Sequence, residues 1–127
     1  MKILKIGNAP KTPGIDFHPG KGNFVVAGIS VPENSRAFYE PIIEWVTEYV
    51  KQPAELTNIV FKLSYINTSS LQFVYDLLML LDSIDSESSK VSVDWYYLEE
   101  DIDMQEIGED FRDAICAEFN FFGVENV

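Results

Sequence analysis

The chain has 127 residues, of which 46% are hydrophobic and 13% aromatic, enough apolar material for one packed domain spanning residues 1–127. The 21 acidic and 9 basic residues give a formal net charge of −12. Because such a surface repels phosphate backbones and anionic lipids, binding of nucleic acid and direct binding to membranes are not expected. A single cysteine, no targeting segment and no apolar run of about 20 residues predict a cytoplasmic protein.

The first half of the chain reads as short strands followed by a helix. The predicted strands are residues 2–6, 15–17 and 24–29, the last two joined by a turn at residues 19–22. From Ser35 the apolar residues take helical spacing, with a stripe of Phe38, Ile42, Trp45, Val46 and Tyr49. Ser35 can cap this helix, and Gln52-Pro53 ends it.

The second half alternates strands with helices. The pattern predicts strands over residues 56–66 and 90–100, and helices over residues 69–82 and 103–119. Asp103 is a suitable cap for the last helix, with Glu106 at capping-box spacing. The helical stripe expected there is Met104, Ile107, Phe111, Ile115 and Phe119. This order of elements predicts an α/β fold: a single STAS-like domain with a mixed sheet and helices packed against it.

Enzyme chemistry finds little support in the sequence. The one histidine, His18, lies in a turn, and Cys116 falls on the inner face of the last predicted helix, so we interpret both as structural. Neither a P-loop nor a G-x-G-x-x-G motif is present. No catalytic residue and no cofactor are therefore predicted.

An acidic cluster surrounds the start of the last predicted helix. Its members are Glu99, Glu100, Asp101, Asp103, Glu106, Glu109 and Asp110. Oxygen ligands of this kind suit Mg²⁺ or Ca²⁺, but the order of residues does not match a calcium-binding hand. Acids are also favoured by the dipole at a helix N-terminus. We interpret the cluster as a solvated face or a docking surface for a basic partner, with no metal; a small enzyme or metal-binding protein is the alternative.

The junction Asn67-Thr68-Ser69-Ser70, between the strand at 56–66 and the next helix, carries the strongest functional signal. A helix start needs one capping side chain, and this junction offers four. A hydroxyl at a helix N-terminus, beyond the carboxyl end of a strand, lies where ligands bind in open α/β sheets. A phosphate there would meet free N–H groups and the positive end of the helix dipole. The residues alone leave two readings open, a cap or a modification site.

Two segments carry a resemblance to known proteins. "YINTSSLQFVYDLL" resembles the phosphorylation segment of STAS-type anti-sigma-factor antagonists, with Asn67 at the usual aspartate and Leu71 at the usual glycine. The chain is more similar to the SiaC family of bacterial regulatory phosphoproteins. That resemblance runs nearly end to end and rests on "GISVPENSRAFYEPIIEWVTEYV", "FKLSYINTSS" and "VDWYYLEEDIDMQEIGEDF".

The SiaC resemblance implies a mechanism. Thr68 would be the phosphoacceptor, modified by a GHKL-type serine/threonine kinase and dephosphorylated by a PP2C-type phosphatase. The unmodified protein would bind and activate a diguanylate cyclase, which links it to cyclic-di-GMP signalling and biofilm formation. An anti-sigma-factor antagonist that controls transcription is the alternative from the same fold.

A second loop is expected beside Thr68. "SVPENS" also follows a strand and precedes a helix, so Glu33, Asn34 and Ser35 are predicted to border the phosphosite together with Asn67, Ser69 and Ser70. For Asn34 and Ser35, helix capping is the competing interpretation. Whether Ser69 or Ser70 shares the modification, and whether a phosphate would act by repulsion or by occlusion, stays open at this level.

Overall fold

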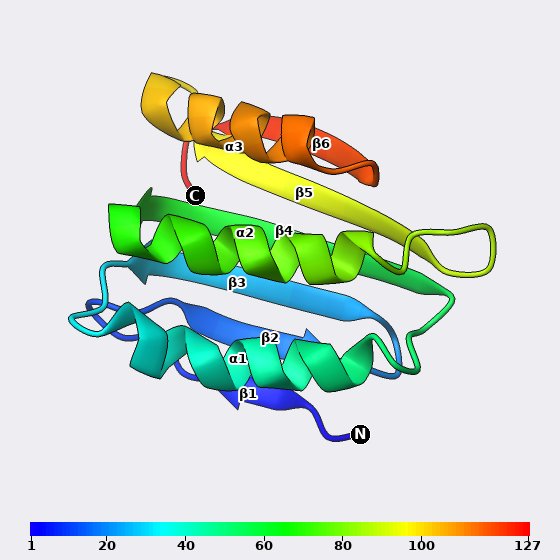
Figure 1. Cartoon of the computed structure of the whole chain (residues 1–127). Coiled ribbons are helices and arrows are strands. Elements are labelled where there is room, and N and C mark those ends of the chain that lie inside the picture. The colour runs from blue at the N-terminus through cyan, green and yellow to red at the C-terminus, as the bar shows by residue number, and fades with distance from the viewer.

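The computed structural model describes residues 1–127 as one six-stranded mixed sheet with three helices (Figure 1). The strands are β1 (Leu4–Ile6), β2 (Gly14–His18), β3 (Asn23–Ser30), β4 (Leu56–Ile66), β5 (Lys90–Leu98) and β6 (Glu118–Val124). The helices are α1 (Ser35–Tyr49), α2 (Thr68–Asp82) and α3 (Ile102–Ala114). The predicted α/β fold with a mixed sheet and packed helices is confirmed. None of the helices has the length and apolarity that a membrane span requires.

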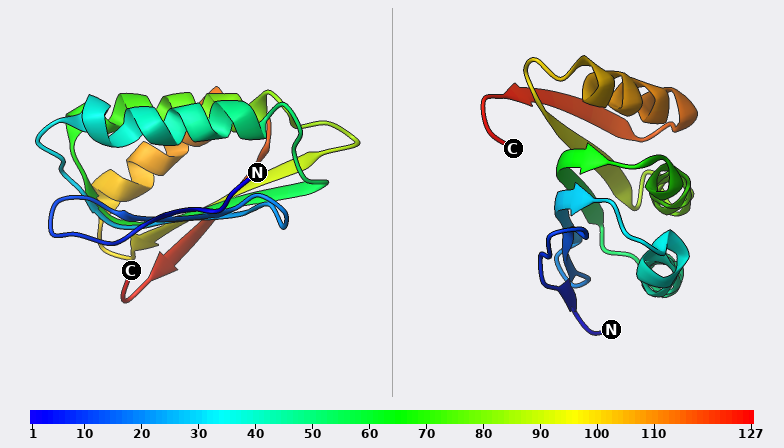
Figure 2. Two further views of the ribbon diagram at one scale, coloured as in Figure 1. Left: turned by 90° about the horizontal axis from the view of Figure 1, so that it is seen from below. Right: turned by 90° about the vertical axis from the view of Figure 1, so that its left-hand side faces the viewer.

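The strands lie in the sheet in the same order as in the chain. β1, β2 and β3 pair antiparallel, whereas β3 to β6 are all parallel. Because each crossover advances in the same direction, crossovers of one hand place every helix on one face. Figure 2 shows α1, α2 and α3 on the same side of the sheet, while the opposite face carries no helix. All three helices also begin at the same end of the sheet, where β3, β4 and β5 end.

The hydrophobic core fills the space between the sheet and the helices. Its largest fully buried side chains come from both layers: Trp95, Tyr39, Tyr49, Phe17, Phe24 and Phe61. Trp95 packs at 5.6 Å, ring centre to ring centre, against Phe111 of α3, and its indole N–H donates to the carbonyl of Met104 at 3.0 Å. Trp45 is half-buried rather than fully enclosed, and its N–H donates to the Lys2 carbonyl.

The last predicted helix is too long, and the strand that follows it was missed. α3 ends at Ala114, and the backbone is already extended at Ile115. Asp82, at the end of α2, accepts hydrogen bonds from the N–H groups of Cys116 and Ala117 at 3.0 and 2.8 Å. This contact holds the chain out of the helix and leads it into β6. Ile115 and Phe119 therefore belong to no helical stripe, and Cys116 is exposed rather than buried in a core helix.

The structure selects Asn34 from the two caps predicted for α1, Asn34 and Ser35, and corrects the cap predicted for α3. Asn34, not Ser35, caps α1 by accepting from the N–H of Ala37, and Asp101, not Asp103, caps α3 by accepting from the N–H of Met104. An N-cap accepts from the residue three positions on, so the observed partners fix the helix starts.

Candidate functional site

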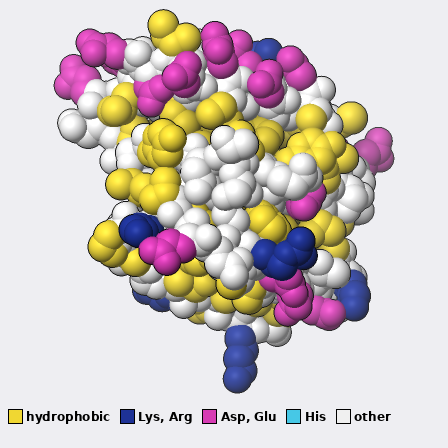
Figure 3. Space-filling model, turned by 60° about the vertical axis from the view of Figure 1, so that its left-hand side comes forward, with side chains coloured by type: hydrophobic (Ala, Val, Ile, Leu, Met, Phe, Trp, Pro, Cys, Tyr) yellow, Lys and Arg dark blue, Asp and Glu magenta, His cyan; other side chains and the backbone are white.

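The predicted phosphosite lies where β3 and β4 end and α1 and α2 begin. We call this region, residues 30–35 and 66–70, the Thr68 end of the sheet. The parallel pairing of Ser30 with Ile66 brings both strand ends together, and the N–H of Asn67 donates to the Ser30 carbonyl at 2.9 Å. Figure 3 shows this side of the molecule, with acidic side chains gathered over its α3 side. The two strand-to-helix loops are thus neighbours, as predicted.

Asn67 caps α2 and gathers three donors on one oxygen. Its Oδ1 accepts from the N–H of Ser70 at 3.0 Å, from the Ser70 hydroxyl at 2.5 Å and from the Ser69 hydroxyl at 3.3 Å. A side-chain amide oxygen provides the acceptor that a helix start needs. The capping interpretation is therefore correct for Asn67, and it leaves the next hydroxyl, that of Thr68, without a capping role.

A chain of buried hydroxyls connects α1 to the start of α2. The Ser30 hydroxyl donates to Ser70 at 2.9 Å, and Ser30 also lies 2.5 Å from the Tyr39 hydroxyl. Since a hydroxyl has one proton to give, Tyr39 donates to Ser30, Ser30 to Ser70, and Ser70 to Asn67. Burial raises the pKa of Tyr39, an effect that the bond to Ser30 and the nearby Ser70 hydroxyl only partly offset. This chain of hydrogen bonds, Tyr39–Ser30–Ser70–Asn67, which we call the buried relay, fixes the first turn of α2 against the core.

The second loop contacts the phosphosite directly through Ser35. Its hydroxyl lies 2.5 Å from the Ser69 hydroxyl, across 34 positions of sequence. Glu33 points elsewhere, to an exposed ion pair with Lys11 at 2.9 Å. That contact raises the pKa of Lys11 and lowers the pKa of Glu33, in both cases mainly through the hydrogen bond between them. Of the three predicted loop residues, Ser35 thus bonds to the junction, Asn34 caps α1, and Glu33 binds a different loop.

Thr68 is the first residue of α2 and is exposed. No hydrogen bond joins its hydroxyl to the rest of the chain, whereas the hydroxyls of Ser69 and Ser70 both have partners. Of the four side chains at the junction, only Thr68 presents a hydroxyl that is both accessible and unengaged.

The β1–β2 loop, residues 7–13, also contributes to this end of the sheet, which was not predicted from the sequence. The carbonyl of Lys11 accepts from the N–H of Val31 at 2.8 Å, next to the ion pair with Glu33. Because β2 runs antiparallel to β3, the loop before β2 must lie where β3 ends. The hairpin predicted over residues 15–29 already implied this position, because the residues before its first strand must lie beside the end of its second strand. Tyr65, the second-last residue of β4, also lies at this end, with 56% of its surface exposed.

The other candidate chemistries are not assembled by the fold. The acidic residues at the start of α3 form no group of three or more metal-binding side chains, and no such group occurs elsewhere in the chain. His18 lies at the end of β2 away from Thr68, with its Nε2 atom 2.8 Å from Asp16 Oδ1. Met79 of α2 has 38% of its surface exposed and belongs to no site.

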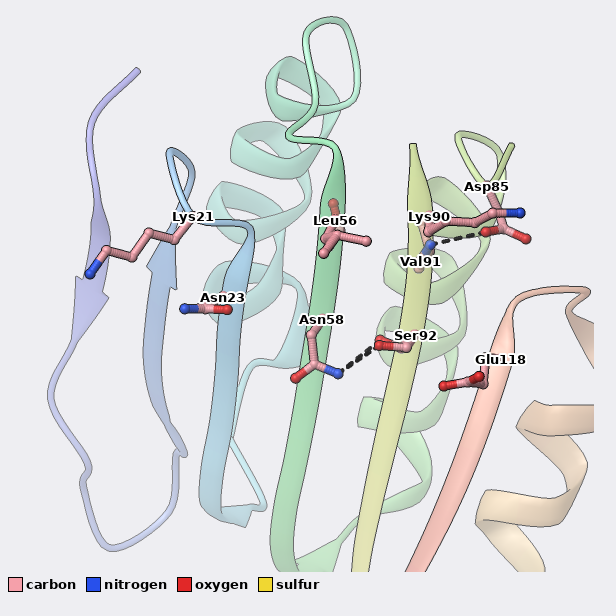
Figure 4. Close-up of a pocket in the computed structure, with 10 residues that line it drawn as sticks. Lys21, Asn23, Leu56, Asn58, Asp85, Lys90, Val91, Ser92 and Glu118 are labelled. Carbon is pink, nitrogen blue, oxygen red and sulfur yellow. Dashed lines mark hydrogen bonds between the residues drawn. The ribbon is translucent and has the colours of Figure 1, made fainter. Parts of the chain in front are cut away.

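A shallow hollow lies at the opposite end of the parallel strands (Figure 4). Its lining includes the first residues of β3 to β6, among them Asn23, Leu56, Lys90 and Glu118. Leu56 is 67% exposed there, and Asn58 donates to the Ser92 hydroxyl at 2.8 Å. The hollow is separated from Thr68 by the length of β4, whose 11 residues span roughly 35 Å. It is not part of the Thr68 end.

The molecule is a small α/β domain with a mixed sheet and helices on one face. Its candidate site is the strand–helix junction at which Asn67 caps α2 and Thr68 exposes its hydroxyl. The chain belongs to the SiaC family of regulatory phosphoproteins, whose family model matches residues 6–124.

Solved structures of SiaC agree with this assignment, and a curated relative matches nearly the whole chain. Apo-SiaC from Pseudomonas aeruginosa superposes with a TM-score of 0.87 at 29% identity, over 95% of this chain and 98% of that one. SiaC from the same organism, solved in complex with the diguanylate cyclase SiaD and described as its activator, gives 0.87 at 28% identity, over 95% and 99% of the two chains. An uncharacterized protein of P. aeruginosa (strain UCBPP-PA14) is 30% identical over 94% of both chains.

Proposed function

We propose that this protein is a phosphorylation-controlled activator of a diguanylate cyclase, with Thr68 as its switch residue, and that it is not itself an enzyme. A GHKL-type serine/threonine kinase adds the phosphate and a PP2C-type phosphatase removes it. The kinship with a SiaC that is described as the activator of a diguanylate cyclase supports the choice of effector. In this scheme the chain contributes a binding surface and a phosphoacceptor, and its partners supply the chemistry.

One observation carries the choice of Thr68: its hydroxyl is the exposed and unengaged one at the junction. A kinase must bring the acceptor oxygen in line with the γ-phosphorus of its nucleotide, which requires a side chain free to leave the surface. Thr68 meets this condition because it is exposed at the first position of α2. The N–H groups of Thr68 and Ser69 also have no intrahelical acceptor, since no helical turn precedes them.

The switch follows from the charge that the phosphate adds. Phosphorylation would add about −1.5 to −2 charges at one point of the Thr68 end. The molecule already has a formal charge of −12, and acids crowd the neighbouring start of α3. A partner that accommodates the neutral hydroxyl must then desolvate a dianion, so docking is weakened without any change of fold.

Intact-mass analysis with fragment mapping tests the proposal. Protein isolated from its native cells is expected to carry a single phosphate on Thr68, which treatment with a PP2C-type phosphatase removes. The Thr68→Ala variant should acquire none. Serine phosphate with an unmodified Thr68 would contradict the choice of Thr68, and no phosphate under any growth condition would contradict a phosphorylation switch.

A further inference from the structure

We infer that the Ser35–Ser69 hydrogen bond confines phosphoryl transfer to Thr68 by keeping the neighbouring Ser69 hydroxyl engaged. The inference rests on the proposed function, because it concerns the selectivity of the same kinase. Thr68, Ser69 and Ser70 are chemically similar acceptors on consecutive residues. A kinase that docks at the Thr68 end meets all three within one helical turn.

Ser70 is excluded by burial. None of its surface is exposed, and its hydroxyl accepts from Ser30 and donates to Asn67. Phosphorylation there would place a dianion in the core between α1 and α2, which the energetics of burying charge forbid.

Ser69 needs a different explanation, because it is exposed. Its hydroxyl donates to Asn67 Oδ1 at 3.3 Å, so the 2.5 Å contact with Ser35 must have Ser35 as donor. The Ser69 hydroxyl thus donates a hydrogen bond to Asn67 and accepts one from Ser35. Successive helical side chains also project about 100° apart, and the bond to Ser35 directs Ser69 toward α1.

Phosphoryl transfer requires the Ser69 hydroxyl to turn away from Ser35 and Asn67 and to point its oxygen at the kinase-bound nucleotide. The hydroxyl oxygen forms a bond to the γ-phosphorus of a nucleoside triphosphate, and the bond from that phosphorus to the β–γ bridging oxygen breaks. The hydroxyl proton passes to a base of the kinase, and a nucleoside diphosphate leaves. Ser69 must first give up its hydrogen bonds, each of which slows its use about five-fold. Thr68 has none to give up.

The experiment compares Ser69 with and without its partner, in chains that lack the preferred acceptor. Thr68→Val and the double variant Thr68→Val, Ser35→Ala are incubated with the GHKL-type kinase and nucleoside triphosphate, and the rate of Ser69 phosphorylation is measured by fragment mapping. Ser35→Ala leaves the α1 cap in place, because Asn34 provides it. The matched control is Ser64→Ala, an exposed hydroxyl on β4 that bonds only to the Gly28 carbonyl, at 3.4 Å.

We expect the double variant to be phosphorylated on Ser69 about five-fold faster than Thr68→Val, and the Ser64→Ala control to change nothing. NMR couplings should also show one Ser69 rotamer in the unaltered protein and rotamer averaging after Ser35→Ala. Equal Ser69 rates, or Ser69 averaging in the unaltered protein, would overturn the inference while leaving Thr68 phosphorylation intact. No phosphate on any junction hydroxyl of the unaltered protein would overturn the proposed function and this inference together.

Discussion

At the scale of single residues, each hydroxyl of the junction has a different fate. Ser70 belongs to the buried relay, Ser69 is held by Ser35, and Thr68 is unengaged. Asn67 makes this division possible, because its one oxygen satisfies both a backbone N–H and the side chains that follow. Because the Asn67 side chain is a neutral amide, it does so without placing a charge beside the Thr68 hydroxyl. Three of the four polar side chains thus order the helix start, and the fourth, Thr68, is the proposed phosphoacceptor.

Tyr39→Phe tests the buried relay. The substitution removes the donor to Ser30 and should lower the free energy of unfolding by about 1 kcal/mol at neutral pH. Since burial raises the pKa of Tyr39 in the folded state, the tyrosine's contribution is fully present below its unfolded pKa of about 10 and is lost as the pH rises toward the folded value.

Urea unfolding at neutral and alkaline pH would measure both effects. Tyr39→Phe should lose part of the alkaline decline in stability that the unaltered protein shows. Tyr75→Phe, at an exposed position of α2, is the matched control and should change neither quantity. An unchanged alkaline slope in Tyr39→Phe would contradict the relay.

At the scale of elements, the structure depends on how closely α3 packs on the sheet. Gly108 lies on the inner face of α3, where an added Cβ would stand 2.6 Å from Trp95 Cδ1 and 2.8 Å from Phe121 Cε1. This close approach lets the indole of Trp95 reach the Met104 carbonyl. α3 in turn places the acidic residues near the Thr68 end.

Gly108→Ala should therefore destabilise the protein although alanine favours helices. Overpacking costs about 1–3 kcal/mol, against a gain in helix propensity of about 1 kcal/mol. The midpoint of urea unfolding, followed by tryptophan fluorescence, should fall. Glu106→Ala, exposed on the same helix, should leave the midpoint nearly unchanged. A higher midpoint for Gly108→Ala would mean that α3 is not seated on Trp95 as described.

The elements also show what the sequence could and could not predict. β4 was predicted with its observed bounds, Leu56–Ile66, because Pro53 precedes it and the capping residues at 67–70 follow it. β6 was missed, since Ile107, Phe111, Ile115 and Phe119 keep a four-residue spacing through the true end of α3. The contact that ends this helix is the hydrogen bond from the Cys116 N–H to Asp82, 34 positions earlier in the chain. The local spacing of apolar residues does not indicate such a distant contact.

The same limit applies to the site. Asn67, Thr68 and the neighbouring loop at 31–35 could be placed together, because parallel strands end at one side of the sheet. The Ser30–Ser70 and Ser35–Ser69 bonds join residues that are 40 and 34 positions apart, and Tyr39 bonds to Ser30 across nine positions. Their hydroxyls look like ordinary caps or surface groups in the sequence, so only the packed structure distinguishes the engaged hydroxyls from the unengaged one.

At the scale of the whole molecule, the two ends of the sheet differ in character. At the Thr68 end, polar loops lie beside the acidic start of α3. The opposite end has a shallow hollow whose lining includes Leu56 and charged residues of both signs: Lys21, Lys90, Asp85 and Glu118. The face of the sheet without helices carries its own contacts, including Lys62 over the ring of Tyr96 at 4.9 Å and Tyr96 stacked on Phe122. A phosphate on Thr68 is expected to affect partners at its own end and to leave the hollow unaffected.

The most direct test of the central claim is the rate of cyclic-di-GMP formation by the partner diguanylate cyclase, titrated with unmodified and with Thr68-phosphorylated protein. We predict that phosphorylation lowers activation by about ten-fold or more, and that phosphatase treatment restores it. Leu56→Ser, in the hollow at the far end of β4, should activate as well as the unaltered protein. Equal activation by the modified and unmodified forms would contradict the account.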